Sequence, residues 1–437
     1  MLSSLLLTVV AEPGGGGTGI PRPARNHLSS LPENVYVRNL FVDRITGPIE
    51  QARKVAPDLV REPGYGHYVQ FFVQEQRGIV NFCFYHGRDT DFASPVSGSF
   101  IVQRDGESGE LRRVKIFYKD DPGSYLSILP RGAEDSQMEI YLLGRKLQER
   151  INIPFPTEQI IRMPVARIMQ LSSAYVNWQF YIPRQEFPPN VLTETDDLAE
   201  QIRPYLKELK DAEDGAIDSL GRYVYIGDGT PQSDREQGGL NCSGFVKWVV
   251  DGILSPITGE LLSVDELKRP HGDYRGNRWS RKLEELEDPF FGLDWTRNLA
   301  IRAHQYVHGI EAQSPEDYDV RHLKYHQYKE DVGYPVEQLP TLLYELARDS
   351  DNYLYLGSVN ELFHGENEVR KHYHVAAFLP WLDQNGRLEV ALFDRNREID
   401  LESFIRTHQG AHIHLVRIPH RGVFQPFDLR LEPVLKR

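Results

Sequence analysis

Residues 238–250 read GGLNCSGFVKWVV and place Cys242, one of the two cysteines of the chain, at the start of an apolar run that favours a helix. The unpaired amides and the positive dipole end at a helix N-terminus lower a thiol pKa from about 8.5 toward neutrality. Gly244 allows other backbone to approach closely. The stretch therefore predicts a cysteine that can act as a nucleophile.

The second cysteine has a different setting. Cys83 lies in residues 79–85, IVNFCFY, a strand-like run with no glycine turn and no helix start. Free cysteine is among the most buried residue types. We therefore interpret Cys83 as a structural residue.

A cysteine nucleophile needs a general base, and residues 371–379, KHYHVAAFL, predict a strand that carries His372 and His374. Strand alternation gives both histidines the same face, so parity does not choose between them. The Val-Ala pair that follows His374 favours it as the base, because small residues let neighbouring backbone come close.

Three segments, in chain order, resemble the NlpC-type cell-wall cysteine peptidases, which have a papain-like fold. Residues 220–229, LGRYVYIGDG, resemble the tyrosine-bearing strand and turn of that family. Residues 241–246, NCSGFV, resemble its nucleophile elbow, and residues 374–376, HVA, resemble the strand of its base. The resemblance covers about residues 195–420 and implies an α+β, papain-like catalytic domain.

The resemblance also implies the roles of the site residues. Cys242 would attack a carbonyl carbon as a thiolate, and His374 would hold the thiol proton and return it to the leaving amine. The backbone N–H of Cys242 and the side chain of Tyr223 would stabilise the oxyanion. Asn241 and Ser243 belong to the oxyanion and substrate-binding surroundings, and many relatives have Asp in place of Asn241. All these groups belong to the protein, so no metal or organic cofactor is expected.

A third polar residue has to orient the imidazole, and residues 388–394, LEVALFD, supply it. Alternation points Asp394 inward with the apolar residues and Glu389 outward. In the family, the third residue is a polar residue on the strand that comes after the strand of the histidine, and it is often His, Asn or Gln. Asp394 is the expected third residue, and Asn396 is the alternative.

Other histidines raise the question of a metal site. His412 and His414 alternate on one strand-like run, and His304 and His308 are four apart on a helix-like run. Neither pair has the further ligands that zinc requires, and the helical pair lacks the glutamate of a metalloprotease motif. We expect structural histidines and no metal.

The nucleophile and the base are much farther apart in the sequence than the compact family domain needs. We therefore expect an insertion at about residues 253–352 that forms a small helical subdomain. Its predicted helices are residues 295–308, 315–330 and 336–348. The subdomain could cover the cleft as a lid, or its charged residues could simply be solvated helix faces.

The first part of the chain has a β-rich pattern of short apolar runs separated by turn residues. The predicted strands are residues 35–42, 68–74, 79–85, 98–104, 111–118, 137–143 and 174–182, with helices near 47–59 and 157–171. Residues 187–197 combine an extended linker with capping residues and mark the domain boundary. We expect a β-rich domain of unknown role at residues 31–190 and the catalytic domain at residues 191–437.

Composition limits the function further. The chain has 437 residues, 40% of them hydrophobic and 26% charged, which predicts two or more globular domains. The net charge of −13 and the lack of a basic block exclude nucleic acid as a partner. No apolar run after the first residues is long enough to span a bilayer.

The first 30 residues are expected to be a leader or a flexible segment. The apolar residues 5–10, LLLTVV, followed by Ala11 and a glycine-rich tract, resemble the end of a signal peptide, although a basic segment is missing. This pattern predicts export to a bacterial cell envelope, in the periplasm or outside the cell.

Together the residues and the resemblance imply a cysteine hydrolase that cleaves an amide bond in the peptide stem of peptidoglycan. One alternative is an amidase or acyltransferase with another substrate, since the same triad supports any acyl transfer. The other is a catalytically idle wall-binding scaffold. The oligomeric state is not predicted.

Overall fold

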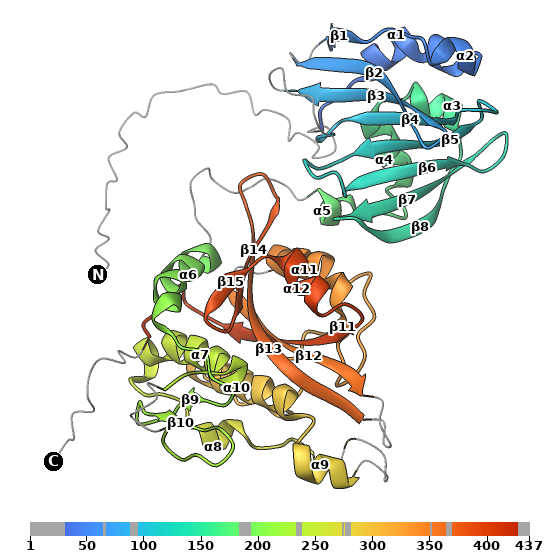
Figure 1. Cartoon of the computed structure of the whole chain (residues 1–437). Coiled ribbons are helices and arrows are strands. Elements are labelled where there is room, and N and C mark those ends of the chain that lie inside the picture. The colour runs from blue at the N-terminus through green and yellow to red at the C-terminus, as the bar shows by residue number, and fades with distance from the viewer. Residues whose placement is uncertain are drawn as a thin grey trace, which may run out of the picture.

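A computed structural model describes residues 31–63, 67–87, 95–182, 194–232, 238–272, 275, 281–349, 352–363 and 369–426. It has mixed α+β architecture, with an antiparallel sheet in the N-terminal part and a second sheet with helices in the C-terminal part (Figure 1). The predicted leader and the linker at residues 187–190 lie outside the described residues. Among the described helices, none combines the length and the apolar composition needed to cross a membrane.

The N-terminal sheet has eight antiparallel strands, each paired with the next along the chain. Between the first long pair of strands, Arg77 and Gly78 form a two-residue turn with φ angles of 51° and 75°, the combination that suits the twist of a hairpin. The strands are β1 (Asp58–Arg61), β2 (Tyr68–Gln76), β3 (Ile79–Gly87), β4 (Phe100–Asp105), β5 (Leu111–Phe117), β6 (Tyr125–Pro130), β7 (Ser136–Leu142) and β8 (Arg145–Ile153).

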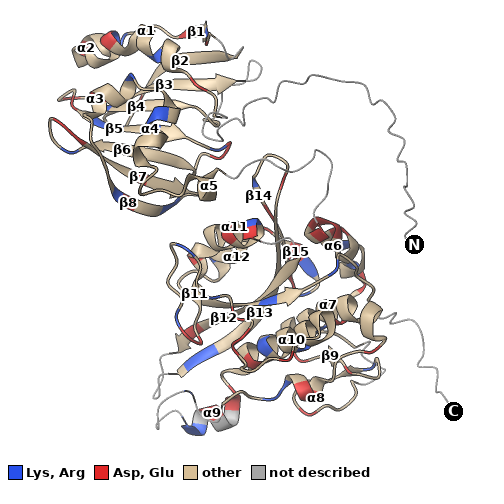
Figure 2. Ribbon diagram, turned by 180° about the vertical axis from the view of Figure 1, so that it is seen from behind, with Lys and Arg blue, Asp and Glu red and all other residues tan. Residues whose placement is uncertain are grey.

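Helices pack against one face of this sheet and complete its core (Figure 2). The core includes Val37 and Phe41 from the first helix and Phe71, Phe82 and Phe100 from the strands. The helices are α1 (Val35–Thr46), α2 (Ile49–Ala52), α3 (Thr157–Ile161), α4 (Val165–Ser172) and α5 (Trp178–Tyr181).

Two predicted strands in this part are wrong, because residues 35–42 lie in α1, and residues 174–182 form a turn followed by the single helical turn α5. The first run is rich in valine and aromatic residues, which have strand propensity. Burial at Val37, Phe41 and Ile45 nevertheless follows helical spacing, so tertiary packing outweighs that propensity. The helix predicted near residues 47–59 is only the single turn of α2, followed by β1.

The C-terminal sheet has six strands in the order β11-β16-β12-β13-β14-β15, all paired antiparallel. A separate two-stranded sheet pairs β9 with β10. The strands are β9 (Ala216–Ile217), β10 (Tyr223–Val224), β11 (Tyr334–Pro335), β12 (Tyr353–Phe363), β13 (Val369–Leu382), β14 (Leu388–Asp394), β15 (Arg397–Ile399) and β16 (His412–Pro419).

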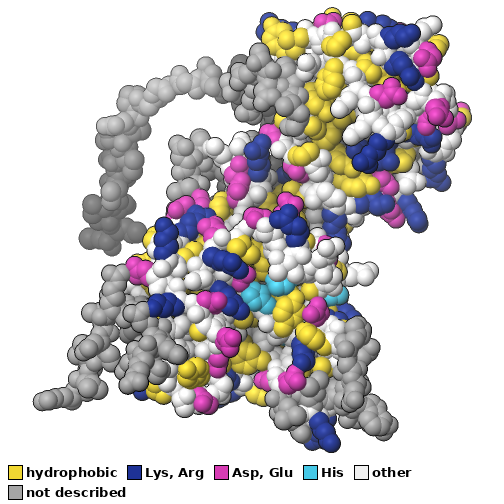
Figure 3. Space-filling view, viewed as in Figure 1, with side chains coloured by type: hydrophobic (Ala, Val, Ile, Leu, Met, Phe, Trp, Pro, Cys, Tyr) yellow, Lys and Arg dark blue, Asp and Glu magenta, His cyan; other side chains and the backbone are white. Residues whose placement is uncertain are grey.

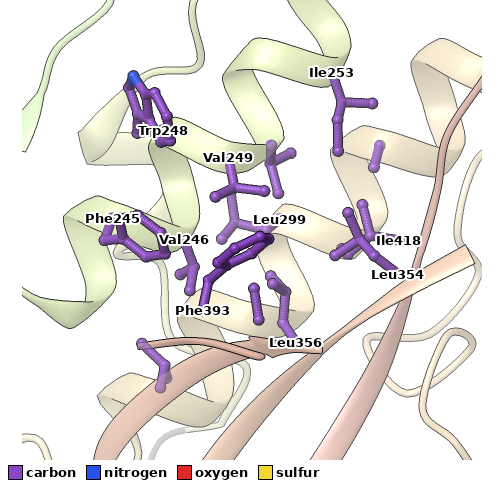
Figure 4. Close-up of a cluster of buried hydrophobic side chains, with 14 of the residues drawn as sticks. Phe245, Val246, Trp248, Val249, Ile253, Leu299, Leu354, Leu356, Phe393 and Ile418 are labelled. Carbon is purple, nitrogen blue, oxygen red and sulfur yellow. The ribbon is translucent and has the colours of Figure 1, made fainter. Parts of the chain in front are cut away.

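Helices cover both faces of the six-stranded sheet and make three layers. Apolar side chains of α7 and α10 fill one interface, where Figure 4 shows Val249 and Leu299 packed toward Leu356 of β12. The opposite face is covered by α11 and α12. The helices are α6 (Glu194–Ile202), α7 (Cys242–Thr258), α8 (Val264–Leu267), α9 (Arg281–Glu287), α10 (Phe291–His308), α11 (Leu339–Asp349) and α12 (Leu401–Thr407), with 3-10 turns η2 (Arg203–Glu208) and η3 (Val336–Gln338).

The expected insertion at residues 253–352 does not form a subdomain of its own. Its helices α10 and α11 cover opposite faces of the central sheet and belong to the core. Residues 315–330 form turns and no helix, so that predicted helix is wrong. The amphipathic pattern correctly indicated two helices, but it carried no information about the surface that their apolar faces cover.

The two parts of the chain contact each other through α5 on one side and α11 on the other. The hydroxyl of Tyr344 donates to the Phe180 carbonyl at 3.3 Å, and the Phe180 and Tyr325 rings are 5.2 Å apart between centroids. The ammonium of Lys119 donates to the Gly386 carbonyl at 3.1 Å. Apolar and polar contacts therefore join the two parts.

Candidate functional site

The nucleophile candidate begins a helix, as predicted. Cys242 is the first residue of α7, and the side chain of Asn241 caps the helix by accepting the Gly244 N–H at 2.8 Å. A Cβ atom on Gly244 would collide with the carbonyl oxygen of Gly215, so glycine is required there. The cap and this close approach fix the start of the helix.

The thiol of Cys242 lies against a free stretch of β13. Strand β14 pairs with β13 only from Ala377 to Leu382, so the preceding residues have no partner strand on that side. The backbone N–H of Val375 forms a hydrogen bond with the Cys242 thiolate and helps to lower the thiol pKa. The end of β14 thus leaves space for the nucleophile at the sheet edge.

A β-bulge in β13 separates the two candidate bases. Val359 of β12 pairs with His374 and Asn360 pairs with His372, so Tyr373 is an extra residue. The bulge breaks the alternation that the sequence predicts. His372 and His374 therefore face opposite sides of the sheet.

His372 is buried against the start of α10. Its Nδ1 is 2.9 Å from the Ser358 hydroxyl, and its Nε2 is 3.0 Å from the Asp331 carbonyl oxygen. Burial holds the pKa of His372 well below its ordinary value. Since both ring nitrogens have protein partners, His372 is a structural histidine and His374 is the base candidate.

His374 lies between the thiol and a carboxylate. It forms a hydrogen bond with Cys242, and its Nε2 is 2.9 Å from Oδ1 of Asp394. The contact is an ion pair between the imidazolium and the carboxylate. The alternative, Asn396, instead donates its amide to the Leu209 carbonyl at 3.1 Å. The geometry thus selects Asp394 as the third residue.

The pKa shifts of Cys242, His374 and Asp394 favour a thiolate on Cys242, an imidazolium on His374 and a carboxylate on Asp394. Burial opposes ionisation of Cys242, but its hydrogen bond and charge interaction with His374 bring the thiol pKa below its ordinary value. Burial also opposes protonation of His374, but Asp394 and the thiolate raise the His374 pKa to about 9. Burial opposes ionisation of Asp394 as well, but His374, with smaller contributions from Arg397 and Arg395, lowers the Asp394 pKa. Cys83 differs, because burial raises its pKa to about 12.

His408, which follows α12, was not among the predicted site residues. Its ring stacks on the His374 ring with centroids 5.3 Å apart, and its centroid is 4.6 Å from that of the Phe404 ring. The hydroxyl of Tyr373 is 3.0 Å from Nδ1 of His408. Burial and the charge of His374 lower the His408 pKa to about 4, so this ring is neutral. No motif marks His408, because its position depends on the bulge and on α12.

The remaining predicted site residues have mixed placements. Tyr223 is partly buried in β10 and packs against the same hydrophobic core as Cys242. Ser243 is buried, and its carbonyl accepts the indole N–H of Trp295 at 3.0 Å. The Asn241 side chain is used by the helix cap. As the first residue of α7, Cys242 has a backbone N–H without an intrahelical acceptor, which suits it to an oxyanion.

The other paired histidines are in structural contacts. His304 stacks on Tyr318 with centroids 3.7 Å apart, and Nε2 of His414 is 3.1 Å from Oδ2 of the buried Asp319. Within the described ranges, no group of three or more His, Cys, Asp or Glu side chains could hold a metal ion. Figure 3 shows histidine side chains at the surface of the C-terminal part.

Comparison with known proteins is informative only for the N-terminal part. Residues 27–180 match a family described as a domain of unknown function (DUF8515). This range contains the eight-stranded sheet and its helices up to α5, in which it ends, before the Cys–His site. No curated protein and no solved structure matches the chain significantly.

Proposed function

We propose that the C-terminal domain is a cysteine hydrolase that cleaves an amide bond. The observation that carries this proposal is the grouping of Cys242, His374 and Asp394, with a thiol pKa that is lowered and an imidazole pKa of about 9. Structural ion pairs also shift pKa values, but a buried thiolate at a helix start has little structural value.

The reaction follows from the positions of these groups. The Cys242 thiolate attacks the carbonyl carbon, and the oxyanion forms at the N-terminus of α7 beside the Cys242 N–H. His374 donates its proton to the leaving amine as the C–N bond breaks, which leaves a thioester. His374 then takes a proton from water, and the hydroxide releases the acid and regenerates the thiol. Asp394 keeps the imidazole oriented through both steps.

We further propose that the substrate is a peptide stem of bacterial peptidoglycan and that the enzyme acts in the cell envelope. The support is the resemblance of three segments, in chain order, to NlpC-type peptidases. The second and third of these segments carry Cys242 and His374, which lie together in the fold. We also propose that the C-terminal domain has a papain-like fold. The proposal assigns no role to the N-terminal domain.

The test is incubation of the purified protein with peptidoglycan and with defined stem peptides, followed by mass spectrometry. Cys242→Ala should give no fragments, and Cys83→Ala should cleave like the wild type if it remains folded. Fragments that depend on Cys242 would identify the bond. An intact substrate with a reactive Cys242 would point to another acyl substrate, and an unreactive Cys242 would leave the wall-binding scaffold.

A further inference from the structure

The turn that ends the strand of Asp394 begins with Arg395. Asp394 pairs with Arg397, so Arg395 and Asn396 form a two-residue turn. Arg395 has a φ of 55°, close to the 51° of Arg77 in the hairpin of the N-terminal sheet, so its backbone conformation is that of a hairpin turn. The turn therefore places the Arg395 side chain one residue beyond Asp394 of the site.

The guanidinium of Arg395 is anchored beside the nucleophile loop. Its Nη1 donates to both carboxylate oxygens of Asp211, at 2.9 and 2.7 Å. Asp211 forms a β-bridge with Leu240, two residues before Cys242. The positive charge also helps to lower the thiol pKa of Cys242, and the thiolate in turn helps to raise the pKa of Arg395 against the effect of burial. The ion pair therefore sets a cation within electrostatic reach of the reacting sulfur.

Arg395 has hydrogen-bond donors to spare. Its side chain is 37% exposed, and within the described part of the chain only Nη1 has a protein acceptor. The Nε and Nη2 atoms remain, and they form the edge of a guanidinium that binds a carboxylate through two parallel N–H bonds. Lysine could not offer this geometry.

We propose that Arg395 is a specificity residue that binds a carboxylate of the substrate close to the scissile amide. The substrate class is then an acidic peptide with a negative group next to the cleaved bond. This inference rests on the proposed function, because it assumes that Cys242 is the nucleophile. Asp211 has two effects, since it holds the guanidinium in place and also competes with the substrate for it.

Two alkylating reagents test this inference without knowledge of the substrate. Iodoacetate and iodoacetamide react in the same way: the Cys242 sulfur forms a bond to the methylene carbon and iodide leaves. The reagents differ only in a carboxylate or a carboxamide. The measured quantity is the ratio of the two rate constants for the Cys242 peptide at pH 7, read by mass spectrometry.

We expect Arg395→Gln to lower the iodoacetate-to-iodoacetamide ratio about threefold or more, with a smaller effect at high salt. Asp211→Asn should raise the ratio, because it removes the competing carboxylate. The matched control is Arg406→Gln, which makes the same charge change on the exposed face of α12, where Arg406 lies 3.5 Å from Glu402 and donates to the Ser403 hydroxyl at 2.9 Å.

Equal ratios in Arg395→Gln and Arg406→Gln would overturn the inference, since the effect would then come from net charge alone. An unchanged ratio in Arg395→Gln, with rapid alkylation by both reagents, would overturn it and leave the proposed hydrolase intact. A Cys242 that is slow toward both reagents in the wild type would overturn the proposed function together with this inference. Thermal melting of each variant checks that it is folded.

Discussion

Replacement of Asp394 by asparagine tests the electrostatic design of the site. The His374 pKa is about 9, against an ordinary value of 6.5, and this difference corresponds to about 3 kcal/mol in favour of the imidazolium. Burial acts in the opposite direction, so Asp394 and the Cys242 thiolate together supply more than this amount. Asparagine retains the shape of the side chain but removes the negative charge. We therefore expect the His374 pKa to fall by more than one unit toward 6.5.

The assay is a histidine NMR titration of isotope-labelled protein, with the His374 signal assigned from a His374→Ala sample. Asn396→Ala is the control, because that side chain bonds the Leu209 carbonyl and does not contact the imidazole. A titration midpoint near pH 9 in Asp394→Asn would refute the reasoning. If the His374 pKa fell in Asn396→Ala and not in Asp394→Asn, the third residue would be Asn396.

The same raised pKa has a consequence for stability. The folded His374 binds its proton more tightly than the unfolded chain does, so its contribution is complete below pH 6.5 and is lost as the pH rises through about 9. Asp394→Asn should remove most of that dependence. Thermal melting at pH 6 and at pH 10 measures it, and an equal loss at both values would contradict the assignment.

Three further predictions follow from the same geometry. His374→Ala removes the two largest interactions that oppose the effect of burial on the Cys242 pKa, so the pH midpoint of its alkylation should rise above that of the wild type, while an unlabelled Cys83 shows that the fold is intact. Gly244→Ala should lower the free energy of unfolding by about 1–3 kcal/mol, because the new methyl group collides with the Gly215 carbonyl; denaturant titration measures it, and an unchanged midpoint would contradict the contact. Glu345 has a pKa of about 7 from burial, so its stabilising contribution is present below about 4.5 and is lost as the pH rises to about 7. Glu345→Gln should flatten the melting temperature over that range, and a profile identical to that of the wild type would exclude the effect.

Some of the site could be predicted because it depends on local patterns. The glycine-flanked apolar run gave the helix that begins at Cys242, and strand alternation gave the inward direction of Asp394. Both properties are set by neighbours in the sequence. The order of nucleophile and base segments also predicted that Cys242 and His374 would be brought together.

Other features depend on contacts between distant segments and were not predictable in this way. The bulge at Tyr373 requires a shift in pairing between β12 and β13, which no composition signal marks. The long segment between nucleophile and base was interpreted as an insertion, but α10 and α11 are needed to bury the two faces of the sheet. In α1, helical packing prevailed over strand propensity.

The bulge in β13 also has an evolutionary consequence. An extra residue in a strand interrupts the alternation of side chains between the two faces of the sheet. Residues before the bulge therefore face the opposite way from what alternation counted from the residues after it would predict. Regular pairing of all three residues, without the bulge, would direct His372 toward the face of His374, away from Ser358. The opposite orientation of the two histidines thus depends on the shift in pairing between β12 and β13, and any descendant that keeps the site and Tyr373 should keep this shift.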